Sequence, residues 1–244
     1  MNQYYKEDLA YIHDVGFDRY ALQSAPGILD ILTHHAIQAG SIVDLGCGSG
    51  LSAQAFVAAG YDVLGIDISA AMIALARKRL PQATFQVASL FHTEIPHCNT
   101  VTAIGECLNY CFDPTNNHQT LSQLFHRIYD SLAPGGLFIF DLAEPGQVPL
   151  TTPTRSFTEG KDWVVLVEKT EDLERATLTR RIVTFRQVGD RYQRDDEIHQ
   201  LQLYAAPDIT HSLHQVGFQV QTQSQYGDFQ LSKAHIAFIA KKLL

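Results

Sequence analysis

IVDLGCGSGL, residues 42–51, joins an apolar run to three alternating glycines and then to the start of a helix-like segment. Consecutive apolar residues are typical of a strand that is buried on both faces of a sheet. Glycines allow the backbone to turn tightly, and they let a ligand approach the main chain without meeting a Cβ atom. Residues 51–59 have the pattern of a helix that ends at Gly60. The stretch therefore predicts a strand, a glycine turn and a helix whose free N–H groups face a ligand.

The second predicted strand, residues 61–67, ends at Asp67, twenty-one residues after Gly46. A carboxylate at this position can accept hydrogen bonds from both hydroxyls of a ribose. The glycine spacing is G-x-G-x-G, and Leu51 stands where the dinucleotide pattern G-x-G-x-x-G has its third glycine. Asp44 would repel a pyrophosphate, but it can help to hold an ammonium group. The pattern therefore favours S-adenosylmethionine, which has an ammonium group, a ribose and no phosphate.

Residues 43–50, VDLGCGSG, resemble the first motif of class I S-adenosylmethionine-dependent methyltransferases. LAPGGLFIFD, residues 132–141, resembles the turn into the fifth strand of the same family. The resemblance implies an α/β fold with a doubly wound, seven-stranded, mostly parallel sheet of the Rossmann-like kind, in which the last strand is antiparallel. It also implies an enzyme that moves a methyl group from S-adenosylmethionine to an N, O or C nucleophile of a small molecule by in-line displacement, with S-adenosylhomocysteine as product.

Three parts of the chain are expected. Residues 1–40 are rich in tyrosine and are interpreted as an N-terminal helical lid, in which Pro26 occupies the first turn of a helix capped by Ser24. Residues 41–149 and 206–244 form the methyltransferase core, in which Ser69 caps the helix after the second strand. Between them, residues 150–205 follow a linker-like segment and contain β-rich runs, which predict an inserted β cap over the substrate.

The expected cofactor site follows from the resemblance, residue by residue. The glycine turn holds the amino-acid portion and Asp44 orients it, while Asp67 binds the ribose. Ser89 stands where the family commonly has an acid that receives the adenine amino group, so the Ser89 hydroxyl or the backbone around Leu90 is the alternative to that acid. The expected cofactor-binding residues are Asp44, Gly46, Cys47, Gly48, Gly50, Asp67, Ile68, Ser89, Leu90 and Glu106.

Three side chains are candidates for proton transfer. An ammonium acceptor must lose a proton before it attacks, and histidine suits this task near neutral pH. His199 in the cap and His13 in the lid are the candidate histidines, and Glu106 either handles an acceptor proton or is a solvated loop acid. Methyl transfer without a general base is the other possibility. The expected acceptor pocket contains Tyr11, Tyr20, Asn109, Tyr110, Asp141 and Tyr204.

Composition narrows the classes of partner. The 244-residue chain has a formal net charge of −8 and no basic run, which argues against a nucleic-acid surface. No segment approaches about eighteen apolar residues and no apolar signal core occurs, so we expect no membrane partner and a cytoplasmic location. The four cysteines lack metal-ligand spacing, which predicts reduced thiols and no metal site.

Two other functions remain open from the sequence. One is a non-catalytic S-adenosylmethionine-binding protein whose cap contacts a partner protein, and the other is a dinucleotide-dependent oxidoreductase. The sequence leaves open whether the chain is a monomer or a dimer, and it does not identify the methyl acceptor.

Overall fold

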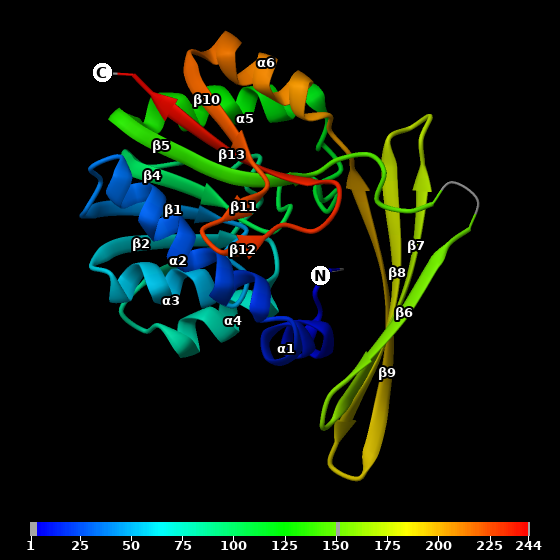
Figure 1. Cartoon of the computed structure of the whole chain (residues 1–244). Coiled ribbons are helices and arrows are strands. Elements are labelled where there is room, and N and C mark those ends of the chain that lie inside the picture. The colour runs from blue at the N-terminus through cyan, green and yellow to red at the C-terminus, as the bar shows by residue number, and fades with distance from the viewer. Residues whose placement is uncertain (1–3, 150–151, 244) are drawn as a thin grey trace.

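The computed structural model describes residues 4–149 and 152–243. The strands of the central sheet are β1 (Gly40–Leu45), β2 (Tyr61–Asp67), β3 (Thr84–Val87), β4 (Cys98–Ala103), β5 (Leu132–Ala143), β10 (Phe218–Gln223) and β13 (His235–Lys242). They lie in the order β10-β13-β5-β4-β1-β2-β3 (Figure 1). Strand β13 runs antiparallel to both of its neighbours, β5 and β10, and the other neighbouring pairs among these described strands are parallel. The predicted doubly wound sheet and its antiparallel last strand are therefore confirmed.

Helices cover both faces of this sheet (Figure 1). They are α1 (Glu7–Gly16), α2 (Arg19–His34), α3 (Leu51–Ala58), α4 (Ala70–Arg79), α5 (His118–Ser131) and α6 (Ala206–Val216). Residues of α2, α3 and α4 form one buried apolar cluster with the sheet, and residues of α5 and α6 belong to another. Ile42 lies in the first cluster and Val43 in the second, because successive side chains of a strand point to opposite faces. The central strand is thus buried on both faces.

The glycine turn after β1 requires its glycines. Gly46, Gly48 and Gly50 have φ values of 75°, 53° and 79°, which residues with a Cβ atom rarely adopt. A Cβ atom on Gly46 would lie 2.4 Å from the Sγ atom of Cys107, whereas one on Gly48 would meet no atom within 4 Å. The turn is therefore packed against the protein at its start and faces open space at its middle.

Two helix starts were predicted, one at Ser69 in the core and one at Ser24 in the lid, and the structure agrees with only the first. The Ser69 side chain accepts a hydrogen bond from the backbone N–H of Met72, so the predicted cap of α4 is confirmed. The expected helix start at Ser24 is wrong, because α2 begins at Arg19 and contains Pro26 in its interior. Burial of apolar side chains on both sides of Pro26 outweighs the backbone hydrogen bond that proline cannot donate.

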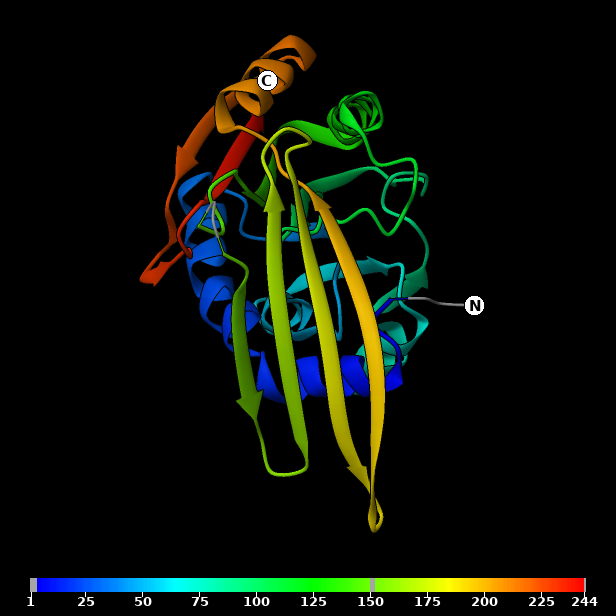
Figure 2. The ribbon, with the colours of Figure 1, turned by 90° about the vertical axis from the view of Figure 1, so that its right-hand side faces the viewer.

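A second sheet accounts for the predicted insertion. Its strands are β6 (Thr154–Glu159), β7 (Trp163–Asp172), β8 (Thr177–Val188) and β9 (Arg191–Gln202). All pair antiparallel in the order β6-β7-β8-β9, which confirms an antiparallel β insertion. Figure 2 shows this cap sheet in front of the core, with α1 behind it. Trp163 and Ile182 of the cap pack against Leu9 and Ile12 of α1, so the lid joins the cap to the core.

A short hairpin completes the fold, with β11 (Gln225–Tyr226) paired to β12 (Phe229–Gln230) beside α2. Residues 1–3, 150–151 and 244, at the edges of the expected lid, cap and core, lie outside the described residues. Over the two described ranges, none of the helices has both the length and the apolar character needed to cross a membrane.

Candidate active site

A cavity of about 950 Å³ lies at the carboxyl ends of β1, β2 and β4. The glycine turn and Asp67 line one part of it, and the lid contributes residues such as Tyr5 and His13. The cap contributes residues of β7 and β8, and the segment before β13 contributes Lys233. This volume is in the range of small-molecule and cofactor pockets. Segments of the core, the lid and the cap that are distant in the sequence thus enclose one cavity.

Asp67 connects the glycine turn to the end of β2. Its Oδ2 atom accepts a hydrogen bond from the backbone N–H of Gly48 at 2.9 Å, and its Oδ1 atom accepts one from the N–H of Ser69 at 2.8 Å. Burial raises the pKa of Asp67, although these backbone donors act in the opposite direction. The carboxylate is therefore held at the cavity by the main chain, in the place expected for a ribose ligand.

Asp44 has an unused acceptor in the same cavity. Its side chain is buried, and its Oδ1 atom accepts a hydrogen bond from the Thr102 hydroxyl at 2.7 Å. Its Oδ2 atom has no hydrogen-bond partner among the described residues. Burial raises the pKa of Asp44 to about 6. A buried carboxylate oxygen without a partner suits a cationic donor, so the site fits the ammonium group of S-adenosylmethionine.

The expected adenine position contains an acid that the sequence did not reveal. Ile68, Ser89 and Leu90 line the cavity, and the Ser89 hydroxyl donates a hydrogen bond to the Oδ2 atom of Asp113. Asp113 also lines the cavity, and its Oδ1 atom accepts the N–H of Thr115 at 2.9 Å. The loop after β4 thus brings a carboxylate beside Ser89, where the strand itself lacks one. Only the tertiary fold joins these two positions.

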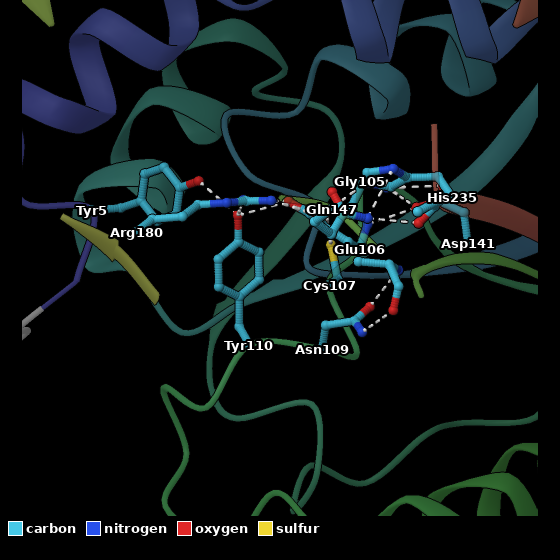
Figure 3. Close-up of polar contacts among 12 residues, drawn as sticks. Tyr5, Gly105, Glu106, Cys107, Asn109, Tyr110, Asp141, Gln147, Arg180 and His235 are labelled. Atoms are coloured by element: carbon cyan, nitrogen blue, oxygen red, sulfur yellow. Dashed lines mark hydrogen bonds and ion pairs between the residues drawn. The ribbon is translucent and has the colours of Figure 1, made fainter. Parts of the chain in front are cut away.

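Glu106 stands at the centre of a buried polar network (Figure 3). The guanidinium of Arg180 in the cap binds both carboxylate oxygens of Glu106, one of them at 3.0 Å. His235 Nε2 lies 3.0 Å from Glu106 Oε2, and the Tyr110 hydroxyl donates to Oε1 at 3.3 Å. Burial by itself raises the pKa of Glu106, but Arg180 and His235 outweigh it, and the pKa falls below its usual range. Glu106 is therefore an ionised, fully occupied carboxylate, neither a solvated acid nor a free base.

Asp141 holds the loop that carries Glu106. Its carboxylate accepts the backbone N–H groups of Gly105 and Glu106, at 3.0 and 2.6 Å, and the Tyr226 hydroxyl at 3.2 Å. Burial raises the pKa of Asp141 to about 6, and the two backbone donors act against this rise. Glu106 has a φ of 56°, an unusual value for a residue with a side chain. Asp141 thus stabilises a strained loop and does not line the cavity.

Four more of the predicted residues also lie away from the cavity lining. Asn109 is buried and hydrogen-bonds to the main chain of Ala143, and Tyr204 donates its hydroxyl to Asn116. The Tyr11 hydroxyl donates to Asp162 at 2.9 Å. His199 is fully buried, with its Nε2 atom 2.8 Å from Glu197. Asn109, Tyr204 and Tyr11 connect different segments of the chain, whereas His199 hydrogen-bonds within its own strand. Residue type and approximate position could not distinguish these structural roles from a role in the pocket.

The remaining predicted residues line the cavity, except Gly50. His13 reaches it from α1, and burial lowers the pKa of its imidazole to about 4, so His13 is neutral near pH 7. Tyr20 and Tyr110 lie at the wall formed by α2 and the loop after β4. The structure adds cationic residues that the sequence did not predict, among them Lys169, Arg180 and His235. No sequence signal marked them, because each comes from a segment with no catalytic motif.

Comparisons with known proteins agree with this geometry. A family model described as a methyltransferase domain matches residues 42–136. A Geobacillus protein with a provisional methyltransferase name is 28% identical over 82% of this chain and 84% of its own length. Trans-aconitate 2-methyltransferase of Variovorax paradoxus is 33% identical, but the match covers only 52% of this chain and 47% of that protein.

The fold has a close counterpart among solved structures. An S-adenosylmethionine-dependent methyltransferase from Clostridium acetobutylicum superimposes with a TM-score of 0.81 at 18% identity, over 96% of this chain and 98% of that one. The glycine turn, the sheet order and the family model together define a methyltransferase domain. Residues 42–136 match the methyltransferase domain family, and the whole chain shares its fold with that S-adenosylmethionine-dependent methyltransferase. Within the described ranges, no group of three or more His, Cys, Asp or Glu side chains is placed to hold a metal ion.

Proposed function

We propose that this chain is an enzyme that transfers the methyl group of S-adenosylmethionine to an N, O or C nucleophile of a small molecule. The observation that carries the proposal is the single cavity that joins the cofactor position at Asp44 and Asp67 to a chamber under the cap at Glu106 and Arg180. A chamber closed by a lid and a cap suits a small acceptor better than a polymer. The trans-aconitate methyltransferase relative, whose name gives a small molecule as the methyl acceptor, supports this choice.

In this proposal, the cofactor-binding residues hold S-adenosylmethionine and set its orientation. Asp44 binds the ammonium group through its unpartnered Oδ2 atom, the turn from Gly46 to Gly50 receives the amino-acid portion, and Asp67 accepts from the ribose hydroxyls. Ile68 and Leu90 enclose the adenine, beside Ser89 and Asp113. When bound, S-adenosylmethionine supplies an activated methyl group, so the protein mainly has to align the acceptor. Such alignment can contribute about 7–11 kcal/mol in favourable cases.

The acceptor side excludes water and offers a neutral imidazole. Leu9 and Phe17 of the lid and Val165 and Ile182 of the cap give the chamber apolar walls. His13 is neutral near pH 7 and can accept a hydrogen bond from the nucleophilic group of the acceptor. Glu106 acts through Arg180 and His235, and it serves as a positioning residue. Withdrawal from water strengthens each of these electrostatic contacts.

The test measures cofactor binding and turnover separately. Calorimetry with S-adenosylmethionine and with NAD distinguishes a methyl donor site from a dinucleotide site. Incubation with methyl-tritiated S-adenosylmethionine and a pooled metabolite extract then reports transfer to any small acceptor. Tight binding of S-adenosylmethionine with no labelled product from any extract would favour the non-catalytic binding protein. Binding of NAD in place of S-adenosylmethionine would refute the proposal.

A further inference from the structure

Three basic side chains form a row across the cap sheet. Lys169 of β7 pairs directly with Arg180 of β8, which pairs directly with His199 of β9. Directly opposed residues of antiparallel strands point to the same face of the sheet, so all three share the face on which Lys169 and Arg180 line the cavity. Like charges opposite one another destabilise a sheet unless something compensates them. Lys169 and Arg180 therefore place two positive charges side by side on this face, and the question is which groups balance them.

Two members of the row have an acidic partner within the protein. Arg180 binds the Glu106 carboxylate through both terminal nitrogens, and His199 lies 2.8 Å from Glu197. The side chain of Lys169 forms no hydrogen bond or ion pair with any residue that the structure describes. The Nε atom of Arg180 is also buried without a hydrogen-bond partner in that part of the chain. Unused donors thus remain where the cap faces the cavity.

The described surroundings of Lys169 include further donors and the acid Glu106. Its half-buried amino group has a lowered pKa, first because of burial and then because of the nearby charge of Arg180. Glu106 is the acid that opposes this effect, and it already binds Arg180 and His235. Lys233 and His235 line the same cavity. Lys169 and Arg180 therefore bring two positive charges against one negative charge, in a protein whose net charge is −8.

We propose that the methyl acceptor carries an anionic group, a carboxylate or a phosphate, and that Lys169 binds this group beside the Arg180–Glu106 pair. The inference rests on the proposed function, since it names the class of molecule that enters the chamber. An anionic group would relieve the repulsion between Lys169 and Arg180, and it would accept hydrogen bonds from the ammonium group of the Lys169 side chain. It would also fix the orientation of the acceptor, with its anionic end toward the cap and its nucleophile toward the cofactor.

Calorimetry on the full chain saturated with S-adenosylhomocysteine tests the binding part of the inference. Citrate and inorganic phosphate are the two anionic probes, and glycerol is the neutral probe. We expect at least one anion to bind and glycerol not to bind. Lys169→Gln should weaken that binding about ten- to hundredfold, and Lys169→Arg should retain most of it. The probe that binds more tightly distinguishes a carboxylate acceptor from a phosphate acceptor.

Lys161→Gln is the matched control, because Lys161 is an exposed lysine of the same hairpin and lies outside the cavity lining. This variant should bind the anions as the unmodified chain does. The melting temperature of Lys169→Gln should be equal to or above that of the unmodified chain, because the substitution removes a repulsion. Equal anion binding by Lys169→Gln and the unmodified chain, or no binding of either anion, would overturn the inference.

A second measurement separates this inference from the function on which it rests. Small molecules labelled with methyl-tritiated S-adenosylmethionine are passed over an anion-exchange column at pH 8. Product label that the column retains supports an anionic acceptor. Product label in the flow-through, after subtraction of the unreacted cationic S-adenosylmethionine measured without enzyme, overturns it while leaving the methyltransferase function intact. A lack of labelled product counts against the proposed function, and the calorimetric comparison then decides the role of Lys169 by itself.

Discussion

Replacement of Arg180 by methionine is expected to destabilise the whole protein. Arg180 comes from the cap and Glu106 from the core, and their side chains retain only 13% and 11% exposure. Methionine keeps much of the apolar volume of the side chain but removes both bonds to the carboxylate. Glu106 would then be a buried charge whose remaining partners are His235 and Tyr110.

The size of the expected loss of stability follows from the burial of this ion pair. Removal of one partner from a buried ion pair costs about 3–5 kcal/mol, because the other charge is left without compensation. For a chain of about this size, 1 kcal/mol corresponds to about 2–4 °C in melting temperature, so we expect a fall of roughly 6–20 °C. The double variant Arg180→Met with Glu106→Gln should regain much of the loss, because it leaves no buried charge unpaired.

The loss of stability in the Arg180→Met variant should also depend on pH. In the unmodified protein the pKa of Glu106 is lowered, so its contribution is present above the ordinary carboxyl pKa and is lost as the pH falls through the folded-state pKa. Without Arg180, burial dominates and raises the pKa of Glu106. The folded variant then takes up a proton more readily than the unfolded chain, and its deficit should be smaller near pH 5 than at pH 7.5.

Urea denaturation measures these differences. Trp163, the single tryptophan, lies at the contact between the cap and α1 and can report unfolding by fluorescence. Arg155→Met is the control, because Arg155 pairs with Glu168 in the cap but is 77% exposed. The free energy of unfolding of Arg155→Met should fall by no more than about 1 kcal/mol. A loss of that small size in Arg180→Met, or a double variant no more stable than the single one, would refute the reasoning.

Three further predictions concern the cofactor end of the cavity. Asp67→Ala should weaken S-adenosylmethionine binding at least about tenfold in calorimetry, whereas Asp62→Asn, on the exposed side of the same strand, should leave it unchanged. Asp44→Asn should weaken cofactor binding at pH 7.5 and yet raise the free energy of unfolding by up to about 3 kcal/mol. The reason is that the pKa of Asp44 is raised to about 6, so its ionisation destabilises the fold progressively as the pH rises from about 4 to 6. Urea denaturation of both proteins at pH 4 and 7.5 measures this, and an equal difference at the two pH values would contradict it. Asp113→Ala should weaken cofactor binding about two- to tenfold, and unchanged affinity would exclude Asp113 from the adenine site.

The sequence by itself determined the central sheet, the glycine turn and the cofactor end of the site. These features are encoded locally: an unbroken apolar run predicts a strand buried on both faces, and alternating glycines mark a turn with positive φ values. Asp44 and Asp67 follow from their fixed distance to that turn. Local patterns are less reliable where tertiary packing competes with them, as the start of α2 before Pro26 demonstrates.

The acceptor end was decided only by the tertiary structure. Arg180, Lys169 and His235 come from β8, β7 and β13, and nothing in their own segments indicates that they meet Glu106 or the cavity. Asn109 and Asp141 were expected in the acceptor pocket, but their polar side chains form hydrogen bonds with the main chain of neighbouring segments instead. The physical reason is that the charge and hydrogen-bond partners of a buried side chain depend on residues far away in the sequence. Those partners exist only once the lid, the cap and the core have packed together.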